Sequence, residues 1–390
     1  MRYHSYLNSA KTIIDSYRGD VPFAAFIKKY FNANKKYGGK DRKQIATLCY
    51  SFYRLGKAIP QLPGEEKIIV ATFLCENKSS DFLQFHKPEW NEVITKPVAE
   101  KAIIAGFTME DVFPWAEELS NGIDAELYRH SFFIQPDLFL RIRPGNKEKV
   151  LKKLQDTGIA FNMPLDDCLA LPNATKIDAL LEIDKEVVVQ DYNSQQVLNF
   201  IKEPATVNNN PVSTWDCCAA SGGKSILAYD ILNGEIELTV SDIRESILSN
   251  LKNRFETAGI KNYQSFIADL TSADCQLLPI AIGTNCQLLI CDAPCTGSGT
   301  WSRTPEQLYY LKRKTIDVYV AMQQQIVSNV IPHLQAGGLF IYITCSVFKN
   351  ENEDMVNFIK KKFHLQLLQM ELLKGYDKKA DSMFTAVFKK

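Results

Sequence analysis

The chain has 390 residues, of which 46% are hydrophobic, with 45 basic and 45 acidic side chains. This length exceeds one ordinary domain, and the hydrophobic content is enough for each part to bury a core, which excludes a disordered chain. No run approaches the roughly 20 apolar residues of a membrane span, and the first residues lack the apolar core of a secretory signal. We therefore expect a cytoplasmic protein of two or three domains with no membrane association.

The first third of the chain has the apolar spacing of helices. Apolar residues recur three or four positions apart, as in Phe23, Phe26 and Ile27 and in Ile45 and Leu48, and no glycine-rich strand turn interrupts them. The pattern predicts an all-helical domain over residues 1–130.

Charge is unevenly distributed within this helical region. Residues 1–60 contain 12 Lys or Arg and 3 Asp or Glu, whereas residues 61–130 contain 6 and 13. Lys35, Lys36 and Arg42 lie among aromatic residues such as Tyr37, a combination that suits a nucleic-acid backbone. The alternative is an ordinary solvated helix face, which is the usual meaning of a lone basic run.

Residues 131–195 alternate between strand and helix patterns. The segments are PDLFLRIRPG from Pro136 to Gly145, KVLKKLQDTGIAF and EVVVQDYNSQQV. They predict a small α/β module, in which Arg143 could grip a phosphate.

A strand, a glycine turn and a helix open the remaining part of the chain. The apolar run from Val212 to Trp215 leads into DCCAASGGKS and then into a helical pattern. Glycine lets a backbone approach a ligand closely, and the helix that follows offers unpaired N–H groups, so the turn is expected to bind something. A nucleotide-binding P-loop is disfavoured because that motif needs glycine five positions before Gly223, where this chain has Cys218.

Two cysteine segments follow apolar runs further along. DAPCTGSG begins at Asp292 and contains Cys295, and ITCS ends at Ser346 and contains Cys345. Both runs are typical of buried parallel strands, so both thiols are expected at strand carboxyl ends, where such sheets bind ligands. Asp292 could perform acid–base chemistry there, although aspartate before proline is also a common turn residue.

Asp242 and the remaining cysteines are further candidates for ligand or metal binding. Asp242 follows an apolar run about 20 positions after the glycine turn, a spacing that suits ribose hydroxyls. The chain has ten cysteines but no CxxC pair, and only five scattered histidines, so we expect no metal site. Cys275, Cys286 and Cys291 are interpreted as packing residues.

Taken together, the three segments resemble the Sun/RsmB family of RNA cytosine-5 methyltransferases. The family's signatures read roughly DxCAAPGGKT, DAPCSGxG and TCS, and they occur here in the same order. The stretch from Gly38 to Ile59 is similar to the family's NusB-like domain, and VQDYNSQ resembles the signature that leads into the catalytic domain. The resemblance implies a NusB-like helical RNA-binding domain (1–130), a small α/β RNA-binding module (131–195) and a Rossmann-like methyltransferase domain (196–390).

The resemblance also implies roles for individual residues. Cys345 would be the nucleophile and Cys295 would assist breakdown of the adduct, although the two roles could be swapped. S-adenosylmethionine would be held by Cys218, Ala219, Ala220, Ser221, Gly222, Gly223, Lys224, Asp242, Asp269 and Asp292. The chain departs from the family pattern at Ser221, where proline is usual, at Ile247, where arginine is common, and in its last strand, which lacks a glycine and a lysine.

The expected chemistry explains the need for a cysteine. Carbon 5 of cytosine is too weak a nucleophile to accept a methyl group unaided, whereas a thiolate that adds to carbon 6 creates an enamine that can accept it. Small-subunit ribosomal RNA is the expected substrate and a monomer the expected state. The alternatives are a transfer RNA methyltransferase, a noncatalytic RNA-binding assembly factor and a methyltransferase for a small molecule.

Overall fold

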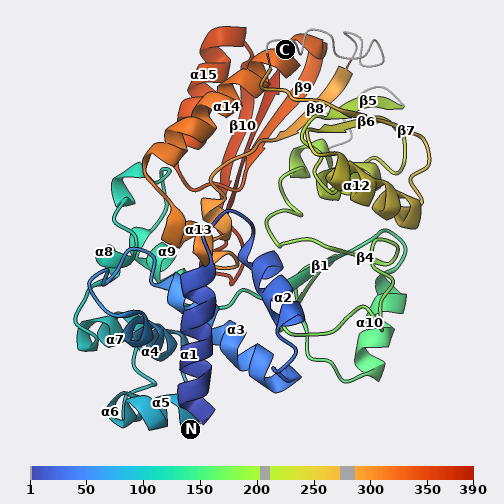
Figure 1. Cartoon of the computed structure of the whole chain (residues 1–390). Helices are drawn as coiled ribbons and strands as arrows, with labels where there is room; N and C mark the ends of the chain where they lie inside the picture. The colour runs from blue at the N-terminus through green and yellow to red at the C-terminus, as the bar shows by residue number, and fades with distance from the viewer. Residues whose placement is uncertain (1, 203–210, 273–285) are drawn as a thin grey trace. The chain divides into compact units, whose positions relative to one another are not determined.

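The computed structural model describes residues 2–202, 211–272 and 286–390, arranged in two compact units (Figure 1). The first unit comprises residues 1–119, 123–135 and 300–312. The second comprises residues 120–122, 136–299 and 313–390. Cys275, which we expected to be a packing residue, lies outside the described residues.

The first unit is helical, as the spacing of its apolar residues predicts. Its longer helices bury their apolar stripes in one core, to which Ile13, Phe23, Leu48 and Phe73 belong. The helices of the N-terminal segment are α1 (Arg2–Ser16), α2 (Phe23–Ala33), α3 (Gly39–Arg54), α4 (Gly64–Cys75), α5 (Asp81–His86), α6 (Pro88–Glu92), α7 (Val98–Ile104), α8 (Met109–Val112), η1 (Ala116–Glu118) and α9 (Ala125–Ser131).

One segment from far along the chain completes this unit. Helix α13 (Pro305–Tyr310) lies in the range that we expected to be catalytic, but it packs in the helical unit. The carboxylate of Glu306 accepts a hydrogen bond from the N–H of Phe23 at 3.2 Å, and the hydroxyl of Tyr310 donates to the carbonyl of Tyr17 at 3.0 Å. Sequence spacing gives no sign of this long-range contact.

The second unit contains a small antiparallel sheet followed in the chain by a large one. The small sheet has the order β2-β3-β1-β4, and helix α10 (Lys147–Asp156) buries Val150 and Leu154 in its core. Its strands are β1 (Leu138–Ile142), β2 (Asn162–Leu165), β3 (Cys168–Leu171) and β4 (Val187–Val189). The sequence patterns predict β1, α10 and β4 but not the hairpin of β2 and β3.

The large sheet has seven strands in the order β10-β11-β9-β8-β5-β6-β7. The pairs from β9 to β7 are parallel, and β11 pairs antiparallel with both β9 and β10. The strands are β5 (Val212–Asp216), β6 (Ile236–Asp242), β7 (Tyr263–Ile267), β8 (Cys286–Asp292), β9 (Leu334–Thr344), β10 (Gln366–Leu373) and β11 (Met383–Lys389). This is the Rossmann-like α/β sheet expected from the strand–turn–helix pattern.

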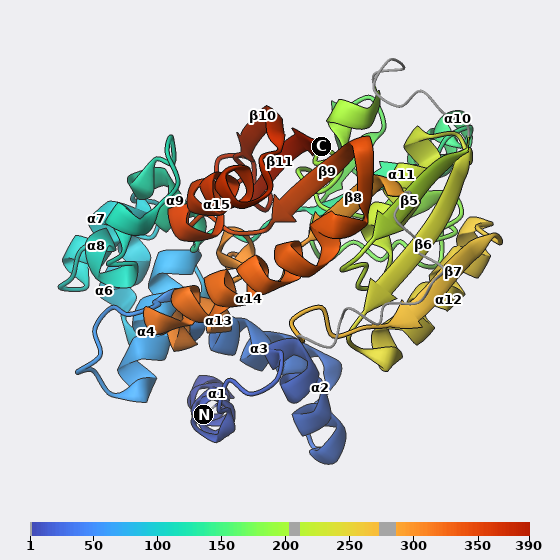
Figure 2. The same ribbon diagram turned by 90° about the horizontal axis from the view of Figure 1, so that it is seen from above.

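Helices cover both faces of the large sheet (Figure 2). Helices α11 (Gly223–Ile231) and α12 (Glu245–Ala258) pack on one face, and α14 (Lys314–Val330) and α15 (Glu353–Phe363) pack on the other. Alternate residues along each strand therefore enter different cores: Leu288 and Ile290 of β8 enter the first, and Leu289 and Cys291 enter the second. The remaining described elements are short 3₁₀ turns: η2 (Asn199–Lys202), η5 (Ser298–Thr300), η6 (Ile331–His333) and η7 (Lys349–Glu351).

A buried ion-pair cluster connects the small sheet to the large one. Arg143 donates to both carboxylate oxygens of Asp230 on α11, and Arg141 of β1 donates to Oδ2 of the same residue at 2.7 Å. Arg143 also donates to the backbone carbonyls of Asp184 and Ala258. Arg143 is buried, and its guanidinium N–H groups donate to Asp230 and to backbone carbonyls. The prediction that Arg143 binds a phosphate is therefore wrong.

Candidate active site

The two cysteines singled out in the sequence come together at the carboxyl ends of neighbouring strands. Asp292 of β8 lies opposite Ile343 of β9 in a parallel pair. Beyond the strands, the N–H of Gly299 donates to the carbonyl of Cys345 at 2.8 Å, which keeps the two loops side by side. The Sγ atoms of Cys295 and Cys345 are 3.3 Å apart, so both thiols can reach one small reacting group.

The surroundings of Cys295 raise the pKa of its thiol. The hydrogen bond to Cys345, burial, and the nearby charges of Cys345 and Glu351 all raise the pKa of Cys295 well above its usual range. These surroundings therefore favour the thiol form of Cys295, and in its hydrogen bond with Cys345 either sulfur can be the donor. This arrangement favours Cys345 as the nucleophile and Cys295 as the group that carries a proton.

An ion pair connects the glycine turn to the Cys295 loop. The ammonium of Lys224, at the start of α11, lies 2.8 Å from Oδ2 of Asp292. Burial acts to lower the pKa of Lys224, but the Asp292 carboxylate outweighs burial, so that the pKa is raised. Lys224 therefore stays charged and holds Asp292 at the edge of the sheet.

The glycine turn has the backbone shape that its sequence requires. Gly222 has φ +83°, and a Cβ at this position would lie 2.6 Å from a ring carbon of Phe255. Gly223 differs, because a Cβ there would meet no atom within 4 Å. The turn therefore presents an open cradle at Gly223, and Ser225 anchors the following helix by donating to the buried carboxylate of Asp216 at 2.6 Å.

Arg254 of α12 supports the same turn from behind. It donates to the carbonyl and hydroxyl oxygens of Ser221 at 2.8 and 3.0 Å, and to both oxygens of Asp184 in the loop before β4. Ser221, which replaces the family's proline, thus has a hydrogen-bonding role that proline could not perform through its side chain. Nothing in the sequence pattern pointed to Arg254.

The remaining predicted cofactor residues fall into two groups. The N–H of Ala219 donates to the carbonyl of Ser241, and the N–H of Ala220 donates to Oδ2 of Asp242 at 3.1 Å, so Asp242 lies against the turn. Asp242 also pairs with Arg244, which sequence reasoning missed. Asp269 is not drawn into this cluster, because its carboxylate accepts from the N–H and hydroxyl of Thr271.

Cys218 belongs to a cluster of three thiols. Its Sγ and those of Cys217 and Cys291 all lie within 4.8 Å of one another. Hydrogen bonds from Cys217 and Cys218 lower the pKa of Cys291 to about 6. Cys291 and Cys286 are buried, as expected of packing residues, but the gathering of Cys291 with the two vicinal cysteines could not be read from their spacing.

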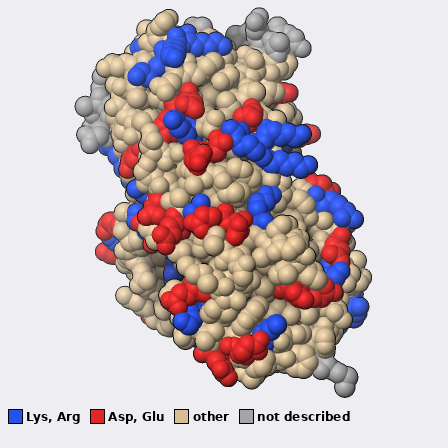
Figure 3. Space-filling model, turned by 90° about the vertical axis from the view of Figure 1, so that its left-hand side faces the viewer, with Lys and Arg blue, Asp and Glu red and all other residues tan. Residues whose placement is uncertain are grey.

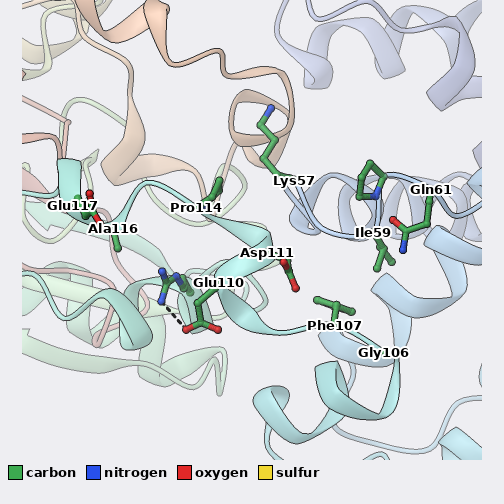
Figure 4. Close-up of a pocket in the computed structure, with 12 residues that line it drawn as sticks. Lys57, Ile59, Gln61, Gly106, Phe107, Glu110, Asp111, Pro114, Ala116 and Glu117 are labelled. Atoms are coloured by element: carbon green, nitrogen blue, oxygen red, sulfur yellow. Dashed lines mark hydrogen bonds and ion pairs between the residues drawn. The ribbon is translucent and has the colours of Figure 1, made fainter.

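The helical unit has a separate hollow of about 660 Å³ that lies among helix ends (Figure 4). Lys57 and Gln61 line it on one side, and Glu110, Asp111 and Glu117 line it elsewhere. Arg129, the other cation in its lining, is paired with Glu110 at 3.0 Å. The excess of carboxylates disfavours a phosphate ligand, and the lining includes no thiol, so we do not place the chemistry there.

The second unit has the fold of a Rossmann-like methyltransferase domain: a mixed sheet with a glycine turn after β5 and an edge where the strand order changes direction. Residues 205–387 match the family model described as 16S rRNA methyltransferase RsmB/F. This part, just under half of the chain, is therefore similar to the family whose signatures the sequence resembles.

Relatives and solved structures agree with this placement. Ribosomal RNA small subunit methyltransferase B of Citrobacter koseri is 26% identical over 228 residues, 57% of this chain and 50% of the relative. The chain thus spans about half the length of the curated relatives that it matches. The crystal structure of PH0851 has a TM-score of 0.70 at 17% identity and covers 100% of this chain and 98% of its own. NSun6 from Pyrococcus horikoshii, solved with SFG, has a TM-score of 0.58 at 15% identity and covers 72% and 96%. These two likenesses concern the fold.

Proposed function

We propose that this protein transfers a methyl group from S-adenosylmethionine to carbon 5 of a cytosine in RNA, with small-subunit ribosomal RNA as the substrate. The observation that carries the proposal is the pair of thiols 3.3 Å apart beside the Lys224–Asp292 ion pair and the glycine turn. The names of the curated relatives support the choice of ribosomal RNA.

The residues present fit the cofactor. The open space over Gly223 would admit its methionine part, and the Asp242 carboxylate at the end of β6 is proposed to bind the ribose hydroxyls. The floor of the site would be formed by the glycine turn, namely Cys218, Ala219, Ala220, Ser221 and Gly222. Lys224 and Asp292 would lie at its inner edge. Asp269 would lie toward the adenine. S-adenosylmethionine would supply the methyl group.

Cys345 and Cys295 would divide the chemistry on the base. The Cys345 sulfur forms a bond to carbon 6, and the electrons of the carbon 5–carbon 6 double bond then let carbon 5 take the methyl group. The proton on carbon 5 is next removed, the double bond re-forms and the carbon–sulfur bond breaks, which returns Cys345. Cys295 assists this breakdown, and Asp292 hydrogen-bonds nitrogen 3 of the base while the adduct exists.

The helical unit would bind the RNA backbone. Lys28 and Lys29 of α2, Lys35 and Lys36 of the following turn, and Lys43 of α3 are exposed. Figure 3 shows one face of the molecule, on which basic and acidic groups alternate without forming one large patch of a single sign. Local basic clusters, not the net charge of zero, are therefore proposed as the phosphate contacts.

The proposal also covers the location, oligomeric state and metal content of the protein. We propose that the protein acts in the cytoplasm, as a monomer and without a metal. In the part of the chain that the structure describes, no helix is both long and apolar enough to cross a membrane.

Methylation of RNA by three forms of the protein tests the function. Unmodified small-subunit ribosomal RNA is incubated with labelled S-adenosylmethionine and wild type, Cys345→Ala or Cys295→Ala, and 5-methylcytosine is mapped. We expect one labelled cytosine with wild type, none with Cys345→Ala, and a trapped protein–RNA adduct with Cys295→Ala. The reverse pattern would exchange the cysteine roles. Transfer only to transfer RNA would change the substrate, and no transfer to any RNA would favour a noncatalytic assembly factor.

A further inference from the structure

The loops that carry Cys295 and Cys345 share one buried carboxylate. Glu351, the last residue of η7, has no exposed surface. Its Oε1 accepts from the N–H of Thr296 at 2.9 Å, and its Oε2 accepts from the Thr296 hydroxyl at 2.5 Å and from the Ser346 hydroxyl. Thr296 directly follows Cys295, and Ser346 directly follows Cys345, so one side chain joins the neighbours of both thiols.

A third partner connects the same carboxylate to the DAPC segment. Gln323 of α14 donates to Oε1 of Glu351 at 3.0 Å and to the carbonyl of Pro294 at 2.9 Å. The backbone carbonyl of Glu351 in turn accepts from the hydroxyl of Tyr342 on β9 at 2.9 Å. Side chain and backbone of Glu351 therefore both contact elements that lead into the cysteine loops.

Each oxygen of Glu351 accepts from two donors, so that an ionised carboxylate satisfies the site. An amide replaces it poorly: an NH₂ group toward Thr296 N–H and Gln323 would face two donors, and one toward the Thr296 and Ser346 hydroxyls would require both to reverse and accept. A buried group with four such bonds holds its partners more firmly than isolated contacts would. Ser298 also joins the loops, through its hydroxyl contact with Ser346 at 3.1 Å and the Val347 N–H that donates to it at 2.9 Å. Glu351 differs because its carboxylate bonds the residues that directly follow each cysteine.

We propose that Glu351 is a positioning residue that fixes the separation of the Cys295 and Cys345 thiols without touching the substrate. The inference deepens the proposed function, since it explains how two thiols from different loops are presented to one base. A displacement of about 1 Å is enough to slow a positioned reaction by about 100-fold, so loss of this carboxylate should act mainly on the chemical step.

Glu353 provides a matched control. It is the same residue type two positions further on, and it accepts from the Ser120 hydroxyl and the Asn121 N–H, both at 2.9 Å, rather than from the cysteine loops. Glu351→Gln and Glu353→Gln therefore remove the same charge from the same segment, but only the first removes the shared acceptor.

The direct test measures thiol separation without relying on catalysis. Diamide takes up two electrons and two protons as it joins two thiols, and a disulfide forms only when the Cβ atoms can approach to about 4 Å. Formation of the Cys295–Cys345 disulfide is followed by mass spectrometry in wild type and both variants. We expect the rate to fall at least about tenfold in Glu351→Gln and to stay at the wild-type value in Glu353→Gln. Equal rates in the two variants would overturn the proposal.

Activity is the second readout. Methyl transfer by Glu351→Gln should fall by about 100-fold, with a KM for S-adenosylmethionine close to that of wild type. If Glu351→Gln fails to fold, Ser346→Ala, which removes one of the four bonds, takes its place and should give a smaller change in the same direction. If wild type methylates no RNA, the proposed function fails, but the comparison of disulfide rates still decides the role of Glu351.

Discussion

The Nζ atom of Lys224 lies 2.8 Å from Oδ2 of Asp292, and this ion pair connects the first turn of α11 to the loop that carries Cys295. Helices α11 and α12 and strands β6 and β7 separate the glycine turn from the cysteine loop in the chain, yet β5 and β8 are adjacent in the sheet. The pair therefore lies where the proposed methyl donor and the base would meet.

Lys224→Met should lower methyl transfer by roughly tenfold to 100-fold, the size expected when a charge-assisted hydrogen bond is lost from a partly buried site. Lys224→Arg, which keeps the charge, should lose less. Single-turnover methylation rates compare the variants at saturating cofactor. An equal fall in the methylation rate of the Met and Arg variants would show that methyl transfer depends on the shape of the Lys224 side chain and not on its charge.

The two glycines of the turn should respond differently to alanine. Gly222→Ala forces a side chain into a positive φ and against Phe255, so the free energy of unfolding should fall by about 2 kcal/mol or more. Gly223→Ala meets no protein atom and favours helix, so stability should be unchanged or slightly higher. Urea denaturation measures both effects.

Binding of S-adenosylmethionine separates these variants further. If the cofactor fills the space over Gly223, the added methyl group of Gly223→Ala should weaken binding by about tenfold in a fully folded protein. Isothermal titration calorimetry measures the affinity. Wild-type affinity in Gly223→Ala would place the cofactor elsewhere.

Asp216 should give stability an unusual dependence on pH. Burial is the main cause that raises the pKa of Asp216 to about 7, and the nearby charge of Asp292 acts in the same direction. Between pH 4 and 7 the folded protein then holds a proton that the unfolded chain has lost. Stability from this group is present below pH 4 and is lost as pH rises toward 7, by about 1 kcal/mol per pH unit.

Asp216→Asn removes this titration while it keeps the size of the side chain. Urea denaturation between pH 5 and 8 should show a flatter stability curve for the variant than for wild type. Parallel curves for the two proteins would mean that Asp216 titrates in its normal range.

The sequence predicts the parts of the site that depend on local pattern. The apolar run before Asp292 and the run before Cys345 each predict a strand, and parallel strands place their carboxyl ends at one edge. This places Cys295 and Cys345 at strand carboxyl ends, and the family resemblance adds that both thiols should lie near the base. The glycine pattern similarly predicts the turn and the start of α11.

Contacts between distant segments could not be predicted in this way. Glu351 lies 55 residues from Thr296, and its role depends on which loops surround η7. Arg254 reaches Ser221 only because α12 packs beside the turn, and α13 joins the helical unit across nearly 300 residues. Such contacts depend on tertiary packing, which neither periodicity nor residue spacing encodes.

The three-thiol cluster should hold no stoichiometric metal in the purified protein. A structural zinc site uses four ligands, and among the described residues the thiols of Cys217, Cys218 and Cys291 form a group of three. We expect substoichiometric zinc by elemental analysis and full methyl transfer after treatment with a chelator. One zinc per chain that disappears in Cys291→Val would reveal a metal site, with Cys286→Val as the control for a buried cysteine outside the cluster.

Asp230 should contribute more to stability than any exposed acidic residue of the second unit. It is the shared counterion of two buried cations, Arg141 and Arg143, and its own side chain is only 5% exposed. Asp230→Ala leaves both guanidinium groups buried without this partner, so the free energy of unfolding should fall by about 3 kcal/mol. Asp317→Ala is the matched control, because Asp317 pairs with Arg313 at a similar distance but is 65% exposed, and its loss should cost less than about 1 kcal/mol. Urea denaturation of both variants at pH 7 makes the comparison. Similar small losses would mean that water or a rearranged acceptor replaces Asp230, and that the contact between the small sheet and α11 depends on packing rather than on charge.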